Sequence, residues 1–313
     1  MTSISGGPVL YTPSVVAGLV ENDINTEQIS IANLQQQLAT GNQVNVPSDN
    51  PTSAAQIMGL NSSYARSQQY IANAADAMGW LGTADSTVNQ INSILSQVHQ
   101  LMLSVSGSDL AGQQNALDAV AAQISNDRTA LINLANTTYN SQPIFAGTGT
   151  TGSAYDSTGS YLGGGSVPTR TVADGVTISI GAVGPNVFGT GATGLLSNGT
   201  GTDPGVGVLA QTVKDLQAGN LSAVEGVDLS NFENAVVPVE NQGAIMGANY
   251  QRAQEFSQQA QNLQATLDEQ ISALQDVNLA QATTQLQLGK NTYQSALWAL
   301  SQSILPSLAQ YLG

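Results

Sequence analysis

The two ends of this chain share one sequence pattern, and the middle has another. From Val20 to Tyr139, and again from about Glu240 to Tyr311, apolar residues recur three and four positions apart among Gln, Asn, Ser and Ala. This spacing predicts amphipathic helices, each with an apolar stripe to bury. The segment 148–206 between them is rich in Gly, Thr and Ser. Because helical ends that bracket such an insert must meet in space, the pattern favours a structural subunit that assembles with copies of itself or its relatives.

The composition supports packing between molecules. Apolar residues make up 41% of the 313 positions, which is typical of a folded protein, whereas charged residues make up only 9%. The outer faces of the helices therefore carry Gln, Asn and Ser where Glu and Lys are usual. Such faces can be buried against neighbours without desolvating a charge.

Charge and cysteine content exclude several functional classes. The formal net charge is −15, and the six basic residues are spread singly, so neither nucleic acid nor an anionic membrane is an expected partner. The absence of cysteine excludes disulfides, thiolate catalysis and Cys-based metal sites. No apolar run is long enough for a membrane span, and Met1 to Leu10 lack the pattern of a cleaved secretion signal. Any export is therefore expected to use another route.

Helix ends can be assigned from their capping residues. A helix that begins near Val20 should end at Thr40, because Gly41 suits the left-handed position after a helix. The next helix should start with Asn50 as N-cap and Pro51 in its first turn, and Asp49 is expected to support this start through the helix dipole.

The second helix carries a stripe from Ile57 to Met102, which at ~1.5 Å per residue is a rod of roughly 70 Å. Gly107-Ser108-Asp109 should end it, and a third helix carries the stripe from Leu117 to Thr138. Downstream, Asp174-Gly175 predicts a β-hairpin between short strands. Short helices are expected over Val206–Leu216 and Ser230–Val237, and a final coil from near Gly243.

The predicted fold class is mainly α with a β-rich insert, in which both chain ends form a long-helix bundle or coiled coil. Three domains are expected: residues 1–45 with 275–313 as a terminal coiled coil, 46–147 with 236–274 as a helical rod, and 148–235 as a β-rich outer domain that tolerates deletion. The two terminal stripes alone make a thin core, so we expect order there to depend on neighbouring molecules. These stripes form the predicted assembly interface: Ile24, Ile31, Leu34, Leu38, Tyr293, Leu297, Leu300, Ile304, Leu308 and Tyr311.

No catalytic or cofactor site is indicated. His99 is the sole histidine, lies off the apolar stripe, and is interpreted as a solvated surface residue. Two Gly-x-Gly-x-x-Gly matches, which begin at Gly147 and Gly189, are interpreted as loops because no helical pattern follows them. The acidic residues show no paired spacing for acid–base catalysis. We therefore predict a protein that is not an enzyme and binds no cofactor or metal.

Several segments resemble the bacterial flagellin superfamily. Leu38–Pro51, which includes Pro-Ser-Asp-Asn-Pro, resembles the N-terminal signature of its hook-associated protein 3 branch, the FlgL family at the hook–filament junction. Leu134–Thr148, Arg170–Phe188, Gly243–Tyr250 and Leu308–Leu312 are also similar to that branch. Ordinary flagellins typically have Lys-Asp-Asp-Ala where this chain has Ser-Asp-Asn-Pro. The Gly6-Gly7-Pro8 segment and the scarcity of charge depart from both groups.

The resemblance implies a layered, flagellin-like architecture and an extracellular position at the hook–filament junction. It implies export through the flagellar type III apparatus without a cleaved signal peptide, and self-assembly into a ring that adapts the hook to the filament, in the service of motility. The implied partners are further copies of the chain, hook-associated protein 1, flagellin, an export chaperone and the export apparatus.

Three alternatives remain from the sequence. The chain could instead be a flagellin or minor flagellin that forms the filament itself. A secreted enzyme is the contrasting class, and a deep pocket lined by converging polar groups would favour it. An adhesin role carried by residues 148–235 is the third, since surface loops host such functions freely.

Overall fold

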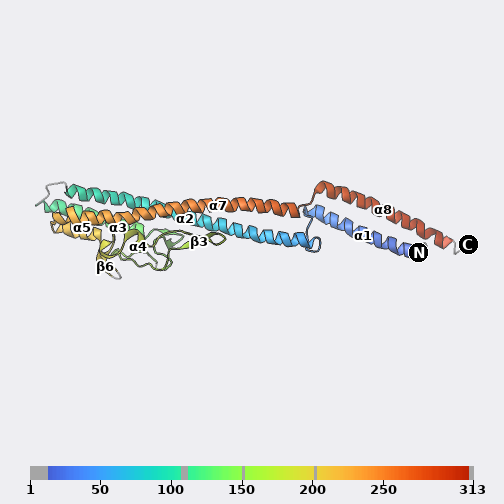
Figure 1. Ribbon diagram of the computed structural model, residues 1–313, viewed down its shortest axis with the longest axis horizontal. Coiled ribbons are helices and arrows are strands. Elements are labelled where there is room, and N and C mark those ends of the chain that lie inside the picture. The colour runs from blue at the N-terminus through green and yellow to red at the C-terminus, as the bar shows by residue number, and fades with distance from the viewer. Residues whose placement is uncertain (1–12, 107–111, 150–151, 201–202, 310–313) are drawn as a thin grey trace, which may run out of the picture. The chain divides into compact units, whose positions relative to one another are not determined.

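The helices at the two ends of the sequence pack against each other, as their stripes predict. The computed structural model describes residues 13–106, 112–149, 152–200 and 203–309. Helix α1 (Pro13–Thr40) lies antiparallel beside helix α8 (Leu279–Ala309), as Figure 1 shows. The protein is mainly helical with a small sheet-containing insert, so the predicted fold class is confirmed.

The chain divides into two compact units. Unit 1 comprises residues 1–65 and 265–313, and unit 2 comprises residues 66–264. Helices α2 (Pro51–Ser106) and α7 (Leu229–Gln275) contribute residues to both units. The finer three-domain division predicted from the sequence stays a prediction.

Unit 2 contains the hydrophobic core. Its helical part combines α2, α7, α3 (Gln114–Ala135), α5 (Val208–Gln217) and the short α6 (Leu221–Ala223). A π-helical turn, Val224–Asp228, leads into α7. The core side chains with no measurable exposure include Leu81, Ile91, Ile124 and Leu131.

The strands are short and form three separate two-stranded antiparallel sheets. They are β1 (Thr138–Tyr139) with β2 (Gln142–Pro143), β3 (Thr169–Ala173) with β4 (Val176–Ser179), and β5 (Asn198–Thr200) with β6 (Asp203–Val206). A short helix, α4 (Gly184–Phe188), and a 3-10 turn, Gly191–Thr193, lie between them.

The β3–β4 hairpin confirms the turn predicted at Asp174-Gly175. Gly175 has φ +68°, a left-handed conformation that glycine adopts without strain. Val172 and Ile178 from its strands are 1% and 0% exposed and belong to the same core as the helices. Phe188 from α4 belongs to it too, at 1%. These burials argue against the deletion tolerance that the sequence predicted for residues 148–235.

The predicted helix ends are confirmed at two places. Gly41 has φ +77° directly after α1, and Ser53 N donates a hydrogen bond to Asn50 Oδ1 at 3.0 Å, which caps α2. The predicted break at Gly107-Ser108-Asp109 lies outside the described residues.

Two expectations about the final helices were wrong. Ser230–Val237 is not a separate short helix, and the last helical region does not start near Gly243, because α7 begins at Leu229 and continues through Pro238. The flanking residues Phe232, Ala235 and Val239 are buried in the unit 2 core. Packing on both sides of Pro238 therefore holds the stretch helical despite the lost backbone donor.

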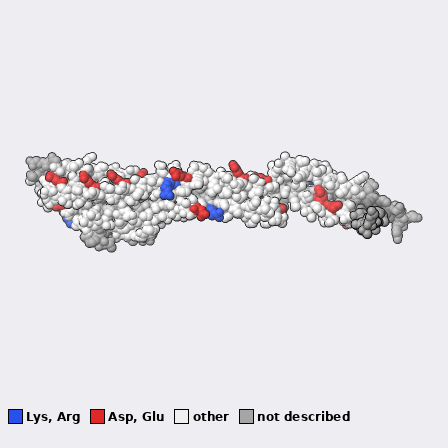
Figure 2. Space-filling view, in the orientation of Figure 1, with Lys and Arg blue, Asp and Glu red and all other residues white. Residues whose placement is uncertain are grey.

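Charged side chains are sparse on the surface. On the face drawn in Figure 2, acidic residues are scattered and no basic cluster is seen. None of the described helices is both long and apolar enough to cross a membrane.

Candidate assembly interface

The described residues of unit 1 form almost no core of their own. The largest fully buried side chains of the described chain, which include Phe145 and Leu195, all belong to unit 2. In unit 1 the buried apolar residues are Ala54, Ile57, Leu267 and Ala282. Among the described residues, the long helices α1 and α8 bury few apolar side chains. They therefore leave apolar surface available to other molecules.

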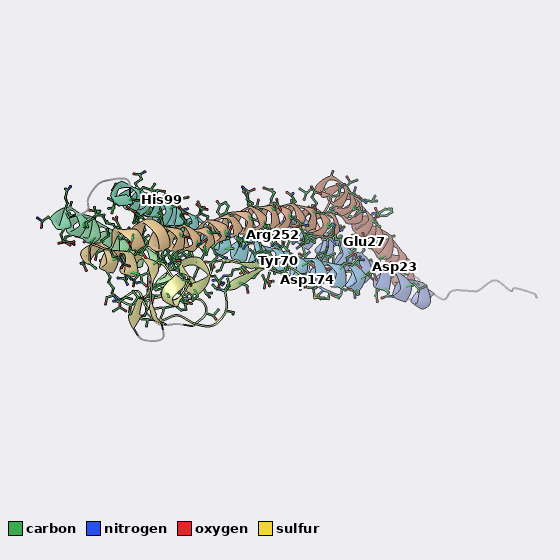
Figure 3. All side chains as sticks on the ribbon, turned by 60° about the vertical axis from the view of Figure 1, so that its left-hand side comes forward. Asp23, Glu27, Tyr70, His99, Asp174 and Arg252 are labelled. Atoms are coloured by element: carbon green, nitrogen blue, oxygen red, sulfur yellow. The ribbon has the colours of Figure 1, made fainter. Side chains whose placement is uncertain are left out.

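Helix α8 approaches α1 closely at a glycine. A β-carbon on Gly289 would lie 2.7 Å from Glu27 Oε1 and 3.4 Å from Ile31 Cγ1. Glu27 is half-buried there, and Figure 3 shows it on α1 together with Asp23. Gly289 therefore allows α8 to approach α1 closely, and a larger residue at this position would push the two helices apart.

The residues predicted for assembly are distributed along this helix pair. On α1, Ile24, Ile31, Leu34 and Leu38 are half-buried. On α8, Tyr293 and Leu300 are half-buried and Leu297 is 42% exposed. The side chains of Ile304 and Leu308, and the whole of Tyr311, lie outside the described residues. The role of the whole set in assembly stays a prediction.

The stripe analysis missed several exposed apolar residues on these helices. Ile29 on α1 is 58% exposed, and Leu288 and Trp298 on α8 are 65% and 68% exposed. Their positions relative to the half-buried residues place them on the outward faces of the two helices. The available signal in the sequence was that Trp298, one of only two tryptophans in the chain, lies off the predicted stripe. The helix pair thus has apolar residues on both its inner and outer faces.

Backbone hydrogen bonds link the segment that follows α1 to the segment that precedes α8, and we call this linked region the elbow. Gln43 N donates a hydrogen bond to Gln275 O at 2.7 Å, and Val277 N donates to Gly41 O at 2.8 Å. Asn278 then caps α8 by accepting a hydrogen bond from Gln281 N at 3.1 Å. These backbone links fix the register of α1 against α8, and the sequence pattern did not predict them.

Asp49 makes hydrogen bonds that the sequence did not predict. Its Oδ2 accepts hydrogen bonds from Asn45 N at 2.9 Å and Val46 N at 3.0 Å. The carboxylate therefore fastens the loop between α1 and α2. The Asn50 side chain caps α2 as predicted, and the dipole role of Asp49 stays a prediction.

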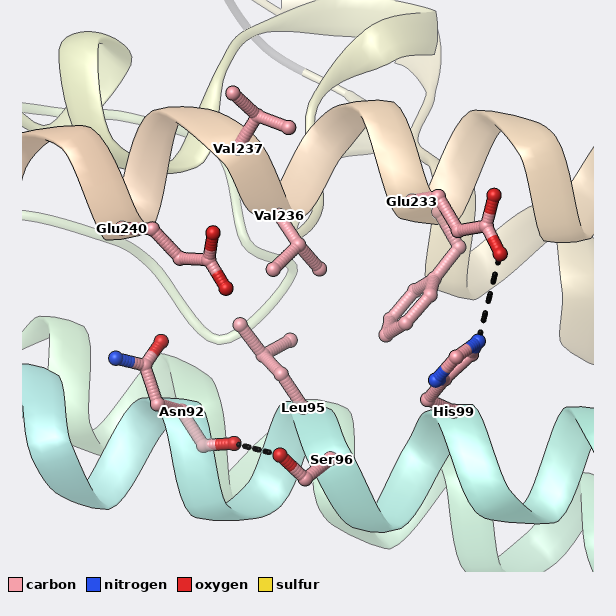
Figure 4. Close-up of a pocket in the computed structure, with 9 residues that line it drawn as sticks. Asn92, Leu95, Ser96, His99, Glu233, Val236, Val237 and Glu240 are labelled. Carbon is pink, nitrogen blue, oxygen red and sulfur yellow. Dashed lines mark hydrogen bonds and ion pairs between the residues drawn. The ribbon is translucent and has the colours of Figure 1, made fainter.

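His99 is also more engaged than predicted. It lines a groove of ≈ 260 Å³ between α2 and α7 within unit 2, drawn in Figure 4. Its ring stacks on Phe232 with centroids 5.9 Å apart, and its Nε2 lies 3.5 Å from Glu233 Oε1. With 39% of its side chain exposed, His99 is only partly solvated. Its partners come from a distant helix, so no local pattern could have indicated them.

The described residues bring no metal-binding set together. No group of three or more His, Asp and Glu side chains among them is placed to hold a metal ion. The groove at His99 has the carboxylates of Glu233 and Glu240 on its α7 wall, with Leu95 and Val236 between the helices, as Figure 4 shows. Its lining residues include no nucleophile paired with a base.

Comparison with known proteins shows similarity to flagellar proteins. Residues 15–150 match the bacterial flagellin N-terminal helical region. Flagellar hook-associated protein 3 of Salmonella typhimurium is 28% identical over 182 residues, which cover 58% of this chain and 57% of that protein. The protein of the same name from Escherichia coli is 24% identical over 257 residues, covering 78% of this chain and 80% of its own.

The chain is similar to flagellin-superfamily proteins of the FlgL family. Solved structures agree on the fold. A flagellar hook-associated protein of Vibrio parahaemolyticus aligns with a TM-score of 0.61 at 17% identity, over 73% of this chain and 100% of that one. Bacillus cereus FlgL aligns with a TM-score of 0.53 at 20% identity, over 71% and 99%.

The similarity to FlgL proteins fits the small number of buried side chains in the described part of unit 1. The curated relatives are flagellar hook-associated proteins by name. The Salmonella match spans little more than half of that protein.

Proposed function

We propose that this FlgL-like protein is a structural subunit of the bacterial flagellum that forms the ring at the hook–filament junction. The observation that carries the proposal is the helix pair of unit 1, which has apolar residues on its inner and outer faces and few buried ones. A surface of this kind becomes stable when it packs among copies. Similarity to two flagellar hook-associated proteins 3 supports the junction position.

The proposal includes the partners and location implied by the family. Further copies of the chain form the ring, with hook-associated protein 1 on the hook side and flagellin on the filament side. The chain reaches this extracellular position through the flagellar type III apparatus, with an export chaperone and without a cleaved signal peptide. It acts without catalysis and without a cofactor.

The domain roles follow the same proposal. Residues 1–45 and 275–313 form the terminal coiled coil of the ring, 46–147 and 236–274 form the rod, and 148–235 lie outermost. The assembly contacts include Ile24, Ile31, Leu34 and Leu38 of α1. The α8 side contributes Tyr293, Leu297, Leu300, Ile304, Leu308 and Tyr311.

Labelling the protein in intact flagella tests the junction role. An epitope tag in an exposed loop of unit 2, detected by gold-labelled antibody, should give one spot where the hook meets the filament. Staining along the whole filament would instead identify a flagellin or minor flagellin. The match over residues 15–150 to the general flagellin helical region supports flagellin or minor flagellin as the second candidate.

A further inference from the structure

Unit 1 carries an open, uncharged groove between α2 and α7. Its volume is ≈ 570 Å³. A β-carbon on Gly59 would meet nothing within 4 Å, so this part of the groove is unfilled by the chain itself. The groove is apolar at Leu60 and Leu274, and Gln56 and Gln270 supply amide groups. The remaining lining residues are Ser63 and Ala273.

The same unit carries an exposed tryptophan. Trp298 on α8 is 68% exposed, and Leu288 on the outward side of the same helix is 65% exposed. A tryptophan side chain is large and apolar and has one N–H donor, so it is usually buried with an acceptor nearby. Trp298 is therefore suited to insert into a surface on another molecule.

Trp298 cannot fill the groove of its own chain. It lies about 30 Å along α8 from Leu279, at ~1.5 Å per residue. The groove lies on the other side of the elbow, before Gln275. Because α8 pairs with α1 over this length, the tryptophan is held away from the groove by its own helix.

One pair of opposite charges lies near the tryptophan and the groove. Lys290 is the one basic residue among the described part of unit 1, and it makes no ion pair with any residue that the structure describes. It lies two turns before Trp298 on α8. Glu269 is exposed on α7 directly before Gln270 of the groove. A second chain seated by its tryptophan would bring this lysine towards that carboxylate.

We propose, on the basis of the proposed ring, that Trp298 of one copy docks into the Gly59 groove of a second copy. The indole N–H would donate to the side-chain oxygen of Gln56 or Gln270. The contact joins two different surfaces of the chain, so it is heterologous. A heterologous contact that repeats from copy to copy builds a closed ring or an open helix, which is the geometry a junction ring requires.

The contact is weak for one pair of molecules. One tryptophan buries roughly 150–250 Å², whereas a stable pair of proteins typically buries more than about 1,200 Å². The docking therefore gains strength from repetition around a ring, where each copy is already held by its neighbours.

Cysteine cross-linking of the full-length chain tests the contact directly, because the natural sequence has no cysteine. Gly59→Cys and Gln294→Cys are prepared separately; Gln294 is exposed one turn before Trp298. The two single variants are mixed at high concentration with an oxidant. A mixed disulfide dimer is expected, and Trp298→Ala in the Gln294→Cys chain should reduce its formation more than about tenfold, as for an interface hot spot. Asn61→Cys, exposed on another face of α2, is the matched control and should not cross-link.

Fluorescence gives a second readout. In a Trp80→Phe background Trp298 is the only tryptophan, and its emission should move to shorter wavelength as protein concentration rises. Gly59→Phe fills the groove from within the chain and should abolish this movement. Circular dichroism of Gly59→Phe shows whether it remains folded.

The outcomes separate this contact from the proposed function. If the mixed dimer is absent, or if Gln294→Cys cross-links only to itself, the heterologous contact is overturned, while junction labelling still tests the ring. If labelling shows the protein along the filament, the junction role fails, and a mixed dimer would still establish the contact between copies.

Discussion

The charge of Asp215 acts on the buried carboxyl group of Asp228. Asp228 is 3% exposed, in the π-helical turn before α7. Asp215 on α5 accepts hydrogen bonds from Gln211 Nε2 at 2.7 Å and from Asn220 Nδ2 at 3.1 Å. Both oxygens of Asp215 thus accept donors, whereas the buried Asp228 Oδ2 has no hydrogen-bond partner among the described residues. Burial, followed by the charge of Asp215, raises the pKa of Asp228 to about 6.

The Asp228 pair predicts a dependence of stability on pH. An aspartate carboxyl in an unfolded chain has a pKa of 3.8, whereas the pKa of Asp228 in the fold is about 6, so the unfolded chain releases this proton first as pH rises. The stabilisation is complete below about pH 4 and is lost as the pH passes about 6, with an upper bound of about 3 kcal/mol. Asp228→Asn should therefore raise the melting temperature of unit 2 near neutral pH and flatten its profile between about pH 4 and pH 8.

Thermal melts of the two proteins across that range check this prediction. Asp118→Asn is the matched control, because Asp118 is exposed on α3. Its profile should follow the wild type. An unchanged profile of melting temperature against pH for Asp228→Asn would show that the titration of Asp228 does not contribute to the stability of unit 2.

Leu300→Asp should block assembly and leave unit 2 intact. Leu300 is half-buried on α8 in line with Tyr293. An unpaired carboxylate buried in a close-packed seam costs several kcal/mol, and symmetry repeats that cost in each copy. Cells with this variant should export the monomer but grow no filament beyond the junction and lose motility. Normal filaments would exclude Leu300 from a buried contact, and Ser301→Asp, exposed on α8, is the control.

Ile304→Asp is expected to act in the same way, from its sequence position on the same stripe. The unit 2 core contains no described residue of α8, so the melting temperature of either variant should stay close to that of the wild type. A large fall in the melting temperature of unit 2 would show that the terminal pair supports that core.

Hydrogen exchange of the free chain should separate the two units. Amides in residues 20–40 and 293–309 should exchange much faster than those of α2 and α3 in unit 2, because few side chains are buried between α1 and α8. Mass spectrometry of dilute protein checks this. Strong protection of both terminal segments at low concentration would mean that the pair is stable without neighbours.

Phe188→Ala should destabilise unit 2 by about 3–5 kcal/mol, as large core truncations do. Phe188 is 1% exposed, and its ring packs edge-on against Phe145 and Tyr155 with centroids 5.5 Å apart. Leu162→Ala, at a residue 43% exposed in the same insert, should change stability little. Equal small effects in a urea titration would indicate that the insert can be lost without loss of the core.

The resemblance to the FlgL family, the fold class and some of the helix ends were accessible from sequence. Asn50-Pro51, Gly41 and Asp174-Gly175 act through their own backbone conformation or through neighbours a few residues away, so local pattern is sufficient to find them. The pairing of the chain ends followed from their stripes, because each apolar face requires a partner.

Contacts between distant segments were decided by the tertiary structure alone. Pro238 stays within a helix because Phe232 and Val239 are buried on either side of it. The stacking of His99 on Phe232 and the raised pKa of Asp228 near Asp215 likewise depend on helices that folding brings together.

Sequence by itself determined the resemblance to the FlgL family, the helical ends and the charge-poor surface that suits assembly. Tertiary structure decided that residues 148–235 contribute to the core of unit 2, that the described part of unit 1 has little core, and that Trp298 faces outward. The physical reason is that periodicity records which face of a helix is apolar, whereas the neighbour that covers the face depends on packing between segments far apart in the chain.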